Sequence, residues 1–270
     1  MCIRDRIRTA VKRVGPEKFL LGEVWEDATT KYGFNQRRTY LLGKGLDSVM
    51  NYPFKNSVLD FVKGKPAEQA ANEILTICEH YPAPAMDTAL NFLSTHDTER
   101  ALTVIADEPA NGRGRQWQSG RCVTGDAYEE GLLRLRMAYA IIYTLPGVPC
   151  LYYGDEIAMQ GYRDPFNRAF FRWDAHEQRL RPVLAQLAQL RHTCEAFRTG
   201  KLWVLRAEGG ILHYQRIGEV ETAEIIVNRT EHIIVETLAS GKSTEVNPMG
   251  FTIVVEEVGH NPNHSYYDYV

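Results

Sequence analysis

Two short apolar runs, each ending in a carboxylate, constrain the fold of this chain more than any other feature. The first begins at Phe19 and ends at Glu23, and the second begins at Phe92 and ends at Asp97. Strands of a parallel sheet are buried on both faces, so they read as continuous apolar runs. In parallel barrels the catalytic groups lie at the C-terminal ends of such strands. We therefore predict an α/β fold in which the two carboxylates share one site.

The first two hundred residues alternate apolar segments with helical ones. Two further apolar runs follow, and the four strands are expected at 19–22, 45–50, 90–94 and 148–153. Apolar residues recur at helical spacing in three segments, 66–80, 132–145 and 182–197. This alternation is typical of strand-helix units in a parallel sheet.

Beyond residue 200 the pattern changes to short β-rich segments separated by turn residues. Five strands are expected, at 202–205, 211–216, 222–228, 232–238 and 250–256. Short strands at this spacing favour an antiparallel sandwich. The end of the chain, residues 259–270, is polar and aromatic without periodicity, and we predict a frayed tail there.

The composition excludes several classes of protein. With 44% hydrophobic and 24% charged residues, the 270-residue chain resembles an ordinary globular protein. A formal net charge of −3 gives no reason to expect a nucleic-acid or membrane partner. The five cysteines are scattered and form no C-x-x-C pair, which indicates neither a disulfide framework nor a zinc site. Free thiols are typical of a reducing compartment, so we expect a cytoplasmic protein.

Several motifs in the chain resemble the α-amylase superfamily (glycoside hydrolase family 13). The segment around Glu23 is similar to the third signature region of this family. The segment around Asp97 is similar to the fourth, with a His-Asp-x-x-Arg motif formed by His96, Asp97 and Arg100. Four more segments are similar to the neopullulanase, cyclomaltodextrinase and maltogenic amylase group, namely 35–44, 47–54, 147–156 and 161–168.

The resemblance extends from about residue 7 to residue 256 and implies a domain organisation. Residues 7–200 would form the C-terminal half of a (β/α)8 TIM barrel, with strands five to eight. Residues 201–258 would form an antiparallel β-sandwich domain, followed by the tail at 259–270. Residues 1–6 fit nothing in the family, and we expect them to be a non-native leader.

The resemblance also implies the roles of two carboxylates in a retaining glycosidase. Such enzymes use an acid and a second carboxylate, the nucleophile, which lie about 5–5.5 Å apart on opposite faces of the sugar. By resemblance, Glu23 is the acid/base, and Asp97 stabilises the transition state by binding sugar hydroxyls. A general acid must hold its proton, which burial beside Trp25 would favour. His96 is implied to bind the same hydroxyls as Asp97.

Four further residues are candidates for substrate binding. Asp164 and Arg168 match a pair that, in related enzymes, binds the sugar next to the cleaved bond on the non-reducing side. Their spacing also suits a simple i,i+4 ion pair. Trp25 is interpreted either as a sugar-stacking wall or as packing at the barrel top. Asn51 is interpreted either as part of the acceptor side or as a helix cap.

The nucleophile of the family is missing from the expected position. It is an aspartate in a G-x-R-x-D strand one strand-helix unit, or about 30 residues, before the acid, whereas only 22 residues precede Glu23. Asp5 is no substitute, because no apolar run precedes it and no adequate helix separates it from Phe19. We therefore expect an N-terminally truncated fragment that is inactive as it stands.

The implied activity of the full-length protein is hydrolysis of α-glucan oligosaccharides such as cyclodextrins, pullulan or maltooligosaccharides. The cleaved links would be α-1,4, with α-1,6 links left open. No cofactor or metal is expected in this chain; calcium and homodimer formation stay open for the full-length protein. The alternative is a non-catalytic interaction protein with the same fold. Retention of Glu23, His96 and Asp97 argues against that alternative, because a binding module gains nothing from the trio.

Overall fold

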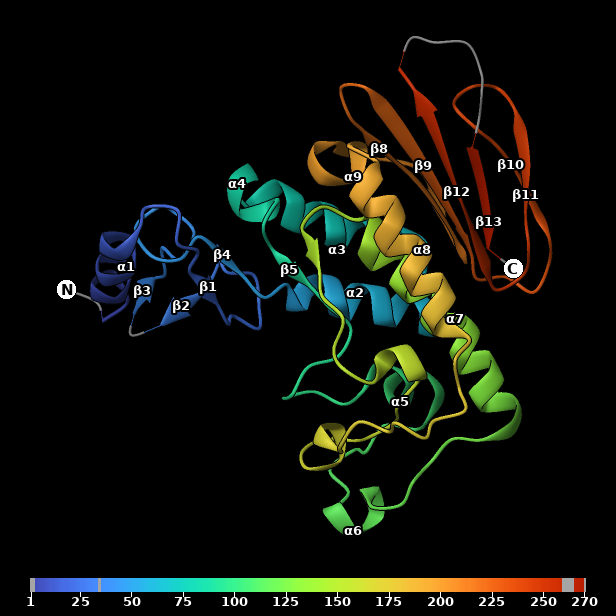
Figure 1. Cartoon of the computed structure of the whole chain (residues 1–270), viewed down its shortest axis with the longest axis horizontal. Helices are drawn as coiled ribbons and strands as arrows, with labels where there is room; N and C mark the ends of the chain where they lie inside the picture. The colour runs from blue at the N-terminus through green and yellow to red at the C-terminus, as the bar shows by residue number, and fades with distance from the viewer. Residues whose placement is uncertain (1–2, 34, 259–264, 270) are drawn as a thin grey trace.

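The computed structural model describes residues 3–33, 35–258 and 265–269 of the chain. Helix α1 (Ile3–Val14) and the first short strands lie at one end of the molecule, helices fill the middle, and a β-sheet lies at the other end (Figure 1). The first two residues of the predicted leader lie outside the described residues, and the rest of it begins α1. None of the described helices is long and apolar enough to cross a membrane.

Four short strands run parallel to one another. Strand β1 (Leu21–Gly22) pairs with β4 (Ser48–Val49), and β5 (Leu90–Asn91) pairs with β6 (Val148–Pro149). A single parallel bridge joins the residue after β4 to the first residue of β5. The four predicted apolar runs thus become four aligned strands, although each is shorter than its run. A small antiparallel hairpin follows β1 and is formed by β2 (Tyr32–Gly33) and β3 (Gln36–Arg37).

Helices separate β4 from β5 and β5 from β6, as the alternation predicted, whereas the β2-β3 hairpin and no described helix lies between β1 and β4. The three expected helices are present as α3 (Ala67–His80), α7 (Gly125–Thr144) and α8 (Leu180–Thr193). The remaining helical segments are α2 (Tyr52–Lys63), α4 (Ala83–Met86), α5 (Ala101–Ala106), α6 (Arg115–Gln118), α9 (Ala196–Thr199) and two 3-10 turns, η1 (Asp155–Ile157) and η2 (Phe166–Arg168).

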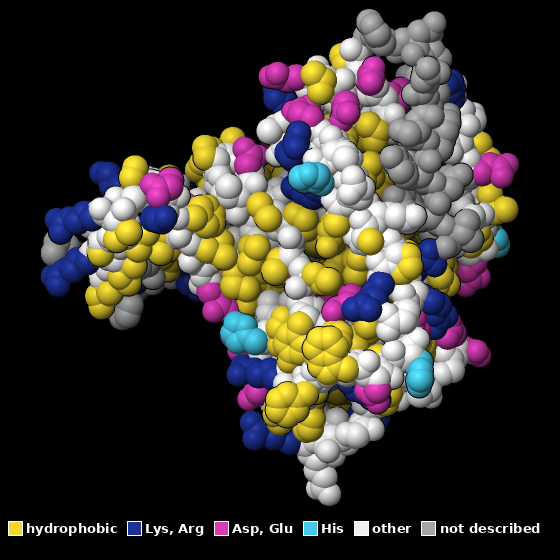
Figure 2. Space-filling model, viewed as in Figure 1, with side chains coloured by type: hydrophobic (Ala, Val, Ile, Leu, Met, Phe, Trp, Pro, Cys, Tyr) yellow, Lys and Arg dark blue, Asp and Glu magenta, His cyan; other side chains and the backbone are white. Residues whose placement is uncertain are grey.

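The outer strands of the parallel set keep apolar side chains in solvent. Among the described residues, β1 and β6 each pair with one neighbour only. Leu21 of β1 is 36% exposed and Val148 of β6 is 44% exposed. Figure 2 shows apolar side chains, some of them large rings, gathered in the middle of one face of the molecule. Parallel strands are normally covered on both faces, so exposed apolar side chains on β1 and β6 are atypical of a parallel sheet.

The C-terminal region is antiparallel, as predicted, and has more strands than expected. Its main sheet has the order β13-β12-β9-β8-β7, and β10 and β11 form a separate hairpin. The bounds are β7 (Lys201–Glu208), β8 (Ile211–Ile217), β9 (Glu221–Asn228), β10 (Ile234–Thr237), β11 (Ser243–Val246), β12 (Gly250–Glu257) and β13 (Ser265–Tyr269). Ile226 and Val254 of the sheet pack with Leu238 and Val246 of the hairpin segment.

The prediction of a frayed tail is wrong for part of the chain's end. Residues 265–269 form β13, which pairs antiparallel with β12 over five residue pairs. The physical reason is that β12 would otherwise present a row of unpaired backbone groups at the edge of the sheet. Residues 259–264 and 270 of the predicted tail lie outside the described residues.

A buried polar contact joins the helical part to the sheet. Arg216 of β8 is 1% exposed and donates hydrogen bonds to the carbonyl oxygens of Thr144 (2.7 Å) and Gly200 (2.8 Å). The hydroxyl oxygens of Tyr214 and Thr144 lie 2.5 Å apart. Burial lowers the pKa of Arg216 to about 10. The end of α7 is therefore bound to the sheet by groups that have no access to water.

A second polar cluster lies between the sheet and the β10-β11 hairpin. His213 of β8 lies with Nε2 2.6 Å from Oε1 of Glu224 and Nδ1 3.4 Å from Oε2 of Glu236. The side-chain amide of Gln215 donates to Oε2 of Glu224 over 3.0 Å. Burial on its own would raise the pKa of Glu224, but the hydrogen bonds from His213, Gln215 and a backbone amide lower it overall. Folding thus favours the ionised form of this carboxyl.

A depressed pKa in the folded state means that Glu224 contributes stability above its unfolded pKa, and that this contribution is lost as the pH falls. We expect Glu224→Gln to unfold at lower urea concentration than the wild type at pH 7. Below about pH 4, near the ordinary value for glutamate, the difference should shrink. Urea unfolding over a pH series measures this. Glu245→Gln, at an exposed position of β11, is the control, and an unchanged pH slope in Glu224→Gln would contradict the assignment.

Candidate active site

Glu23 directly follows β1, and two donors orient its side chain. Trp25 Nε1 donates to Oε1 over 3.1 Å, and the Tyr52 hydroxyl donates to the same oxygen over 2.8 Å. The ring of Tyr52 stacks on Trp25 with centroids 4.3 Å apart and meets Phe92 edge-on at 4.9 Å. Both of these hydrogen bonds are accepted by Oε1, and neither involves Oε2.

Tyr52 lies at the first turn of α2, where its ring is almost fully buried. Burial, and next the hydrogen bond to Glu23, raise the pKa of its hydroxyl well above the ordinary value. The charge of Asp97 raises this pKa as well. Tyr52 therefore stays protonated at neutral pH and lies within electrostatic reach of both predicted carboxylates. The side-chain contact between Tyr52 and Glu23 was not predicted from the sequence.

The four candidates His96, Asp97, Asp164 and Arg168 come together in one network. Asp97 accepts a hydrogen bond from Arg168 Nη2 over 2.9 Å, and its other oxygen lies 3.1 Å from His96 Nε2. Arg168 Nε donates to the backbone oxygen of His96 over 2.8 Å and lies 3.2 Å from Asp164. Asp164 and Arg168 thus form the i,i+4 ion pair. The guanidinium of Arg168 connects the loop after β5 to the loop after β6.

Asn167 supports this network through hydrogen bonds to the backbone, and the sequence analysis did not predict it. It is fully buried, and its side-chain amide donates to the backbone oxygens of His96 and Thr98, both at 2.8 Å, and of Thr95 at 3.3 Å. One amide group therefore fixes the turn that carries Asp97. The signal available in the sequence was its position next to Arg168 in a family-like segment.

Two predictions about individual residues need correction. Asn51 is fully buried; its oxygen accepts from the Phe54 amide (3.3 Å) and its nitrogen donates to Asn91 (2.9 Å). It acts as a helix cap, and no part of its surface is left for a sugar. Glu23 is exposed rather than buried beside Trp25, which is itself 49% exposed. The reason is that no described element covers the free side of β1.

A buried ion pair joins the segment after β5 to the segment after β6. Arg100 is fully buried, lies 3.3 Å from Asp155 and donates to the backbone oxygen of Tyr153 over 2.7 Å. Its guanidinium lies 4.9 Å from the ring centres of Tyr152 and Tyr153. Burial raises the pKa of Asp155 to about 6, even though Tyr139 and Arg100 bond to it. Arg100 therefore orients the carboxylate of Asp155.

Within the described part of the chain, no three histidine, cysteine, aspartate or glutamate side chains come together in a way that could hold a metal ion. The polar groups that meet at this site are carboxylates, an imidazole and a guanidinium. Glu23 lies at the end of β1, and Asp97 follows β5, in the manner of polar groups at the ends of parallel strands. This arrangement defines the class of α/β enzymes with their site at the strand ends.

The chain belongs to the α-amylase family, since residues 3–210 match the model of the alpha amylase catalytic domain. It is 32% identical over 229 residues to a cyclomaltodextrinase of Geobacillus thermopakistaniensis, covering 83% of this chain and 34% of the relative. It is 31% identical over 225 residues to an amylopullulanase of Thermoanaerobacter thermohydrosulfuricus, covering 77% of this chain and 14% of the relative. The chain thus spans about a third or less of these relatives.

The fold is also similar to solved structures. The cyclic alpha-maltosyl-(1→6)-maltose hydrolase of Arthrobacter globiformis, in its ligand-free form, matches with a TM-score of 0.78 at 24% identity. The match covers 94% of this chain and 52% of that one. A likeness at this identity shows the fold, and it includes the C-terminal sheet as well as the helical part, because it extends over nearly the whole chain.

The hydrogen bonds of Asn167 generate a stability prediction. Asn167→Ala leaves three buried or partly buried carbonyl oxygens without this donor, and each costs about 1–3 kcal/mol if it stays unsatisfied. We expect a loss of about 2 kcal/mol or more in the free energy of unfolding. Chemical unfolding followed by circular dichroism measures it. The control Asn72→Ala, on the exposed face of α3, should change little, and equal stability of the two variants would contradict this role.

Proposed function

We propose that this chain is part of a retaining α-glucan hydrolase in which Glu23 is the acid/base and Asp97 stabilises the transition state. Family membership and the names of the relatives support the hydrolase class. The single observation that carries the assignment of residues is the position of Tyr52. It donates to Glu23 and is electrostatically coupled to Asp97, so both carboxylates belong to one local environment.

The proposal includes the architecture. We assign β1, β4, β5 and β6 to strands five to eight of a (β/α)8 barrel, and residues 201–258 to a C-terminal β domain. Support comes from the parallel order of the four strands and from the helices between β4 and β5 and between β5 and β6. The exposed apolar side chains on β1 and β6 agree with it, because a closed barrel covers both edges.

The proposed mechanism is double displacement. Glu23 would donate its proton to the oxygen of the leaving sugar and later accept a proton from water. Asp97 and His96 would bind hydroxyls of the sugar whose bond is cleaved, with contacts that strengthen as positive charge develops. Asp164 and Arg168 would bind the next sugar on the non-reducing side, and the exposed part of Trp25 would stack against a sugar on the other side.

The nucleophile of the proposed mechanism is an aspartate outside these 270 residues. Translating the source DNA upstream of Ile7 in frame tests this directly. A G-x-R-x-D strand about 30 residues, or one strand-helix unit, before Glu23 would support the proposal. A start codon with no such strand would instead favour a non-catalytic interaction protein with this fold.

We expect the 270-residue chain alone to give no turnover of cyclodextrins or nitrophenyl maltoside, and the protein extended upstream to the complete barrel to hydrolyse them. In the extended protein, Glu23→Gln should lower kcat by about 10²–10⁴-fold, the usual contribution of a general acid/base. Glu26→Gln is the control, since Glu26 lies in the same loop and pairs with Lys31. Saturable hydrolysis by the short chain that Glu23→Gln abolishes would refute the nucleophile assignment.

The variant Tyr52→Phe tests whether the Tyr52 hydroxyl orients Glu23 or whether the Tyr52 ring serves packing alone. In the extended protein, this variant keeps the stacked ring but loses the donor to Glu23, so we expect kcat on maltosides with poor leaving groups to fall about tenfold, the equivalent of about 1.4 kcal/mol. Hydrolysis of α-maltosyl fluoride should change little, because fluoride leaves without a proton. Tyr81→Phe, whose oxygen accepts from the Ala28 amide over 3.2 Å, is the buried control. Equal losses on both substrates would contradict the role of Tyr52.

A further inference from the structure

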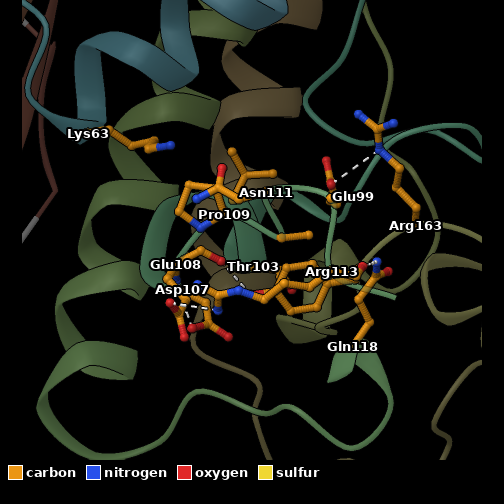
Figure 3. A pocket seen from close by; sticks show the side chains of 14 residues that line it. Lys63, Glu99, Thr103, Asp107, Glu108, Pro109, Asn111, Arg113, Gln118 and Arg163 are labelled. Carbon is orange, nitrogen blue, oxygen red and sulfur yellow. Dashed lines mark hydrogen bonds and ion pairs between the residues drawn. The ribbon is translucent and has the colours of Figure 1, made fainter. Parts of the chain in front are cut away.

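We propose that a pocket beside the candidate active site binds a second segment of α-glucan. The pocket has a volume of about 470 Å³, within the range of ligand pockets in proteins of about 300–1,000 Å³. Figure 3 shows its lining, with Glu99 and Arg163 on one side, Lys63 on another, and Asn111 and Pro109 between them. The identity of the ligand rests on the proposed function, whereas the pocket itself does not.

The pocket and the candidate site share two loops. The turn that places Asp97 in the site places Glu99 in the wall of the pocket two residues later. Likewise, Arg163 lines the pocket while the adjacent Asp164 pairs with Arg168. Glu99 and Arg163 form an ion pair of 3.3 Å across the two loops. A ligand in the pocket therefore lies next to the loops that would hold the substrate.

The far wall of the pocket is the segment from Asp107 to Gln118, which a stack of side chains holds in place. The guanidinium groups of Arg113 and Arg121 lie 4.3 and 4.2 Å from the ring centre of Trp117. Trp117 in turn meets Tyr162 edge-on at 5.3 Å, and the Tyr162 hydroxyl donates to the backbone oxygen of Glu108 over 2.6 Å. The wall is thus tied to the loop that carries Arg163.

The charges of the lining favour a neutral ligand. It includes three cationic side chains, Lys63, Arg113 and Arg163, and three carboxylates, Glu99, Asp107 and Glu108, which sum to zero. Arg113 pairs with Glu108 at 2.9 Å, and Asp107 pairs with Arg121 at 2.7 Å. A phosphate or another anion would meet as many carboxylates as cations.

A polyhydroxylated ligand suits such a lining. Sugar hydroxyls both donate and accept hydrogen bonds, so they can bond to carboxylates, guanidinium groups and amides in turn. The amide side chains of Asn111 and Gln118 lie in the lining together with Tyr162. Under the proposed function the neutral polyhydroxylated molecule nearest to this pocket is the glucan. A chain held in the pocket as well as in the site would bind more tightly than a short one, because the second contact becomes intramolecular.

The test measures binding of maltohexaose to the 270-residue chain by calorimetry. Ala110→Trp fills the pocket from a partly exposed loop position, and Gln118→Ala removes one amide of the wall. We expect at least a tenfold loss of affinity in Ala110→Trp and a smaller loss in Gln118→Ala. Arg115→Ala, on the same segment but outside the lining, should bind as the wild type does. Thermal melting of each variant shows whether it is folded.

Several outcomes would overturn the proposal. They are wild-type affinity in a folded Ala110→Trp, no binding by the wild type, and loss of all binding in Asp97→Asn, which would place the ligand in the candidate site instead. If Ala110→Trp does not fold, the comparison of Gln118→Ala with Arg115→Ala decides. Failure of the proposed function is distinct, since it would appear as no hydrolysis of any α-glucan by the wild-type extended protein.

Discussion

Parallel pairing of β1, β4, β5 and β6 is the constraint on which the rest of the site depends. Parallel strands have their carboxyl ends at the same edge, so the residues that follow them are brought together from distant parts of the sequence. Glu23 follows β1, Tyr52 begins the helix after β4, and Asp97 follows β5. The loop after β6 then contributes Arg168, which bonds to Asp97. The contacts between different loops, Tyr52 with Glu23 and Arg168 with Asp97, require this alignment.

The sequence was sufficient to predict the parts of the fold that depend on local pattern. Apolar runs identified the four parallel strands, and helical spacing identified α3, α7 and α8. Helix α2 was not identified, because its start is marked by Asn51, whose side chain is read equally well as a ligand contact or as a cap. Strand β13 was not identified either, because it exists through pairing with β12, and pairing partners are not visible in a single segment.

Within the candidate site, too, the residues of a local motif were predictable and the contacts with distant residues were not. The resemblance named Glu23, His96, Asp97, Asp164 and Arg168, and the structure places the last four in one hydrogen-bonded network. It did not single out Asn167 within the family-like segment, because a buried amide that supports a turn has no sequence pattern of its own. Nor did it show that Glu23 is exposed, since burial depends on neighbours that a local motif does not specify.

The buried contact between Arg216 and the end of α7 determines how the molecule would respond to being divided. Arg216 is inaccessible to water and its partners, the carbonyls of Thr144 and Gly200, belong to the helical part. Cutting the chain before β7 would leave those carbonyls unsatisfied and uncover the apolar faces that the sheet protects. The C-terminal sheet therefore shares buried contacts with the helical part and is not independent of it. A chimera with another sheet in this place must supply an equivalent guanidinium.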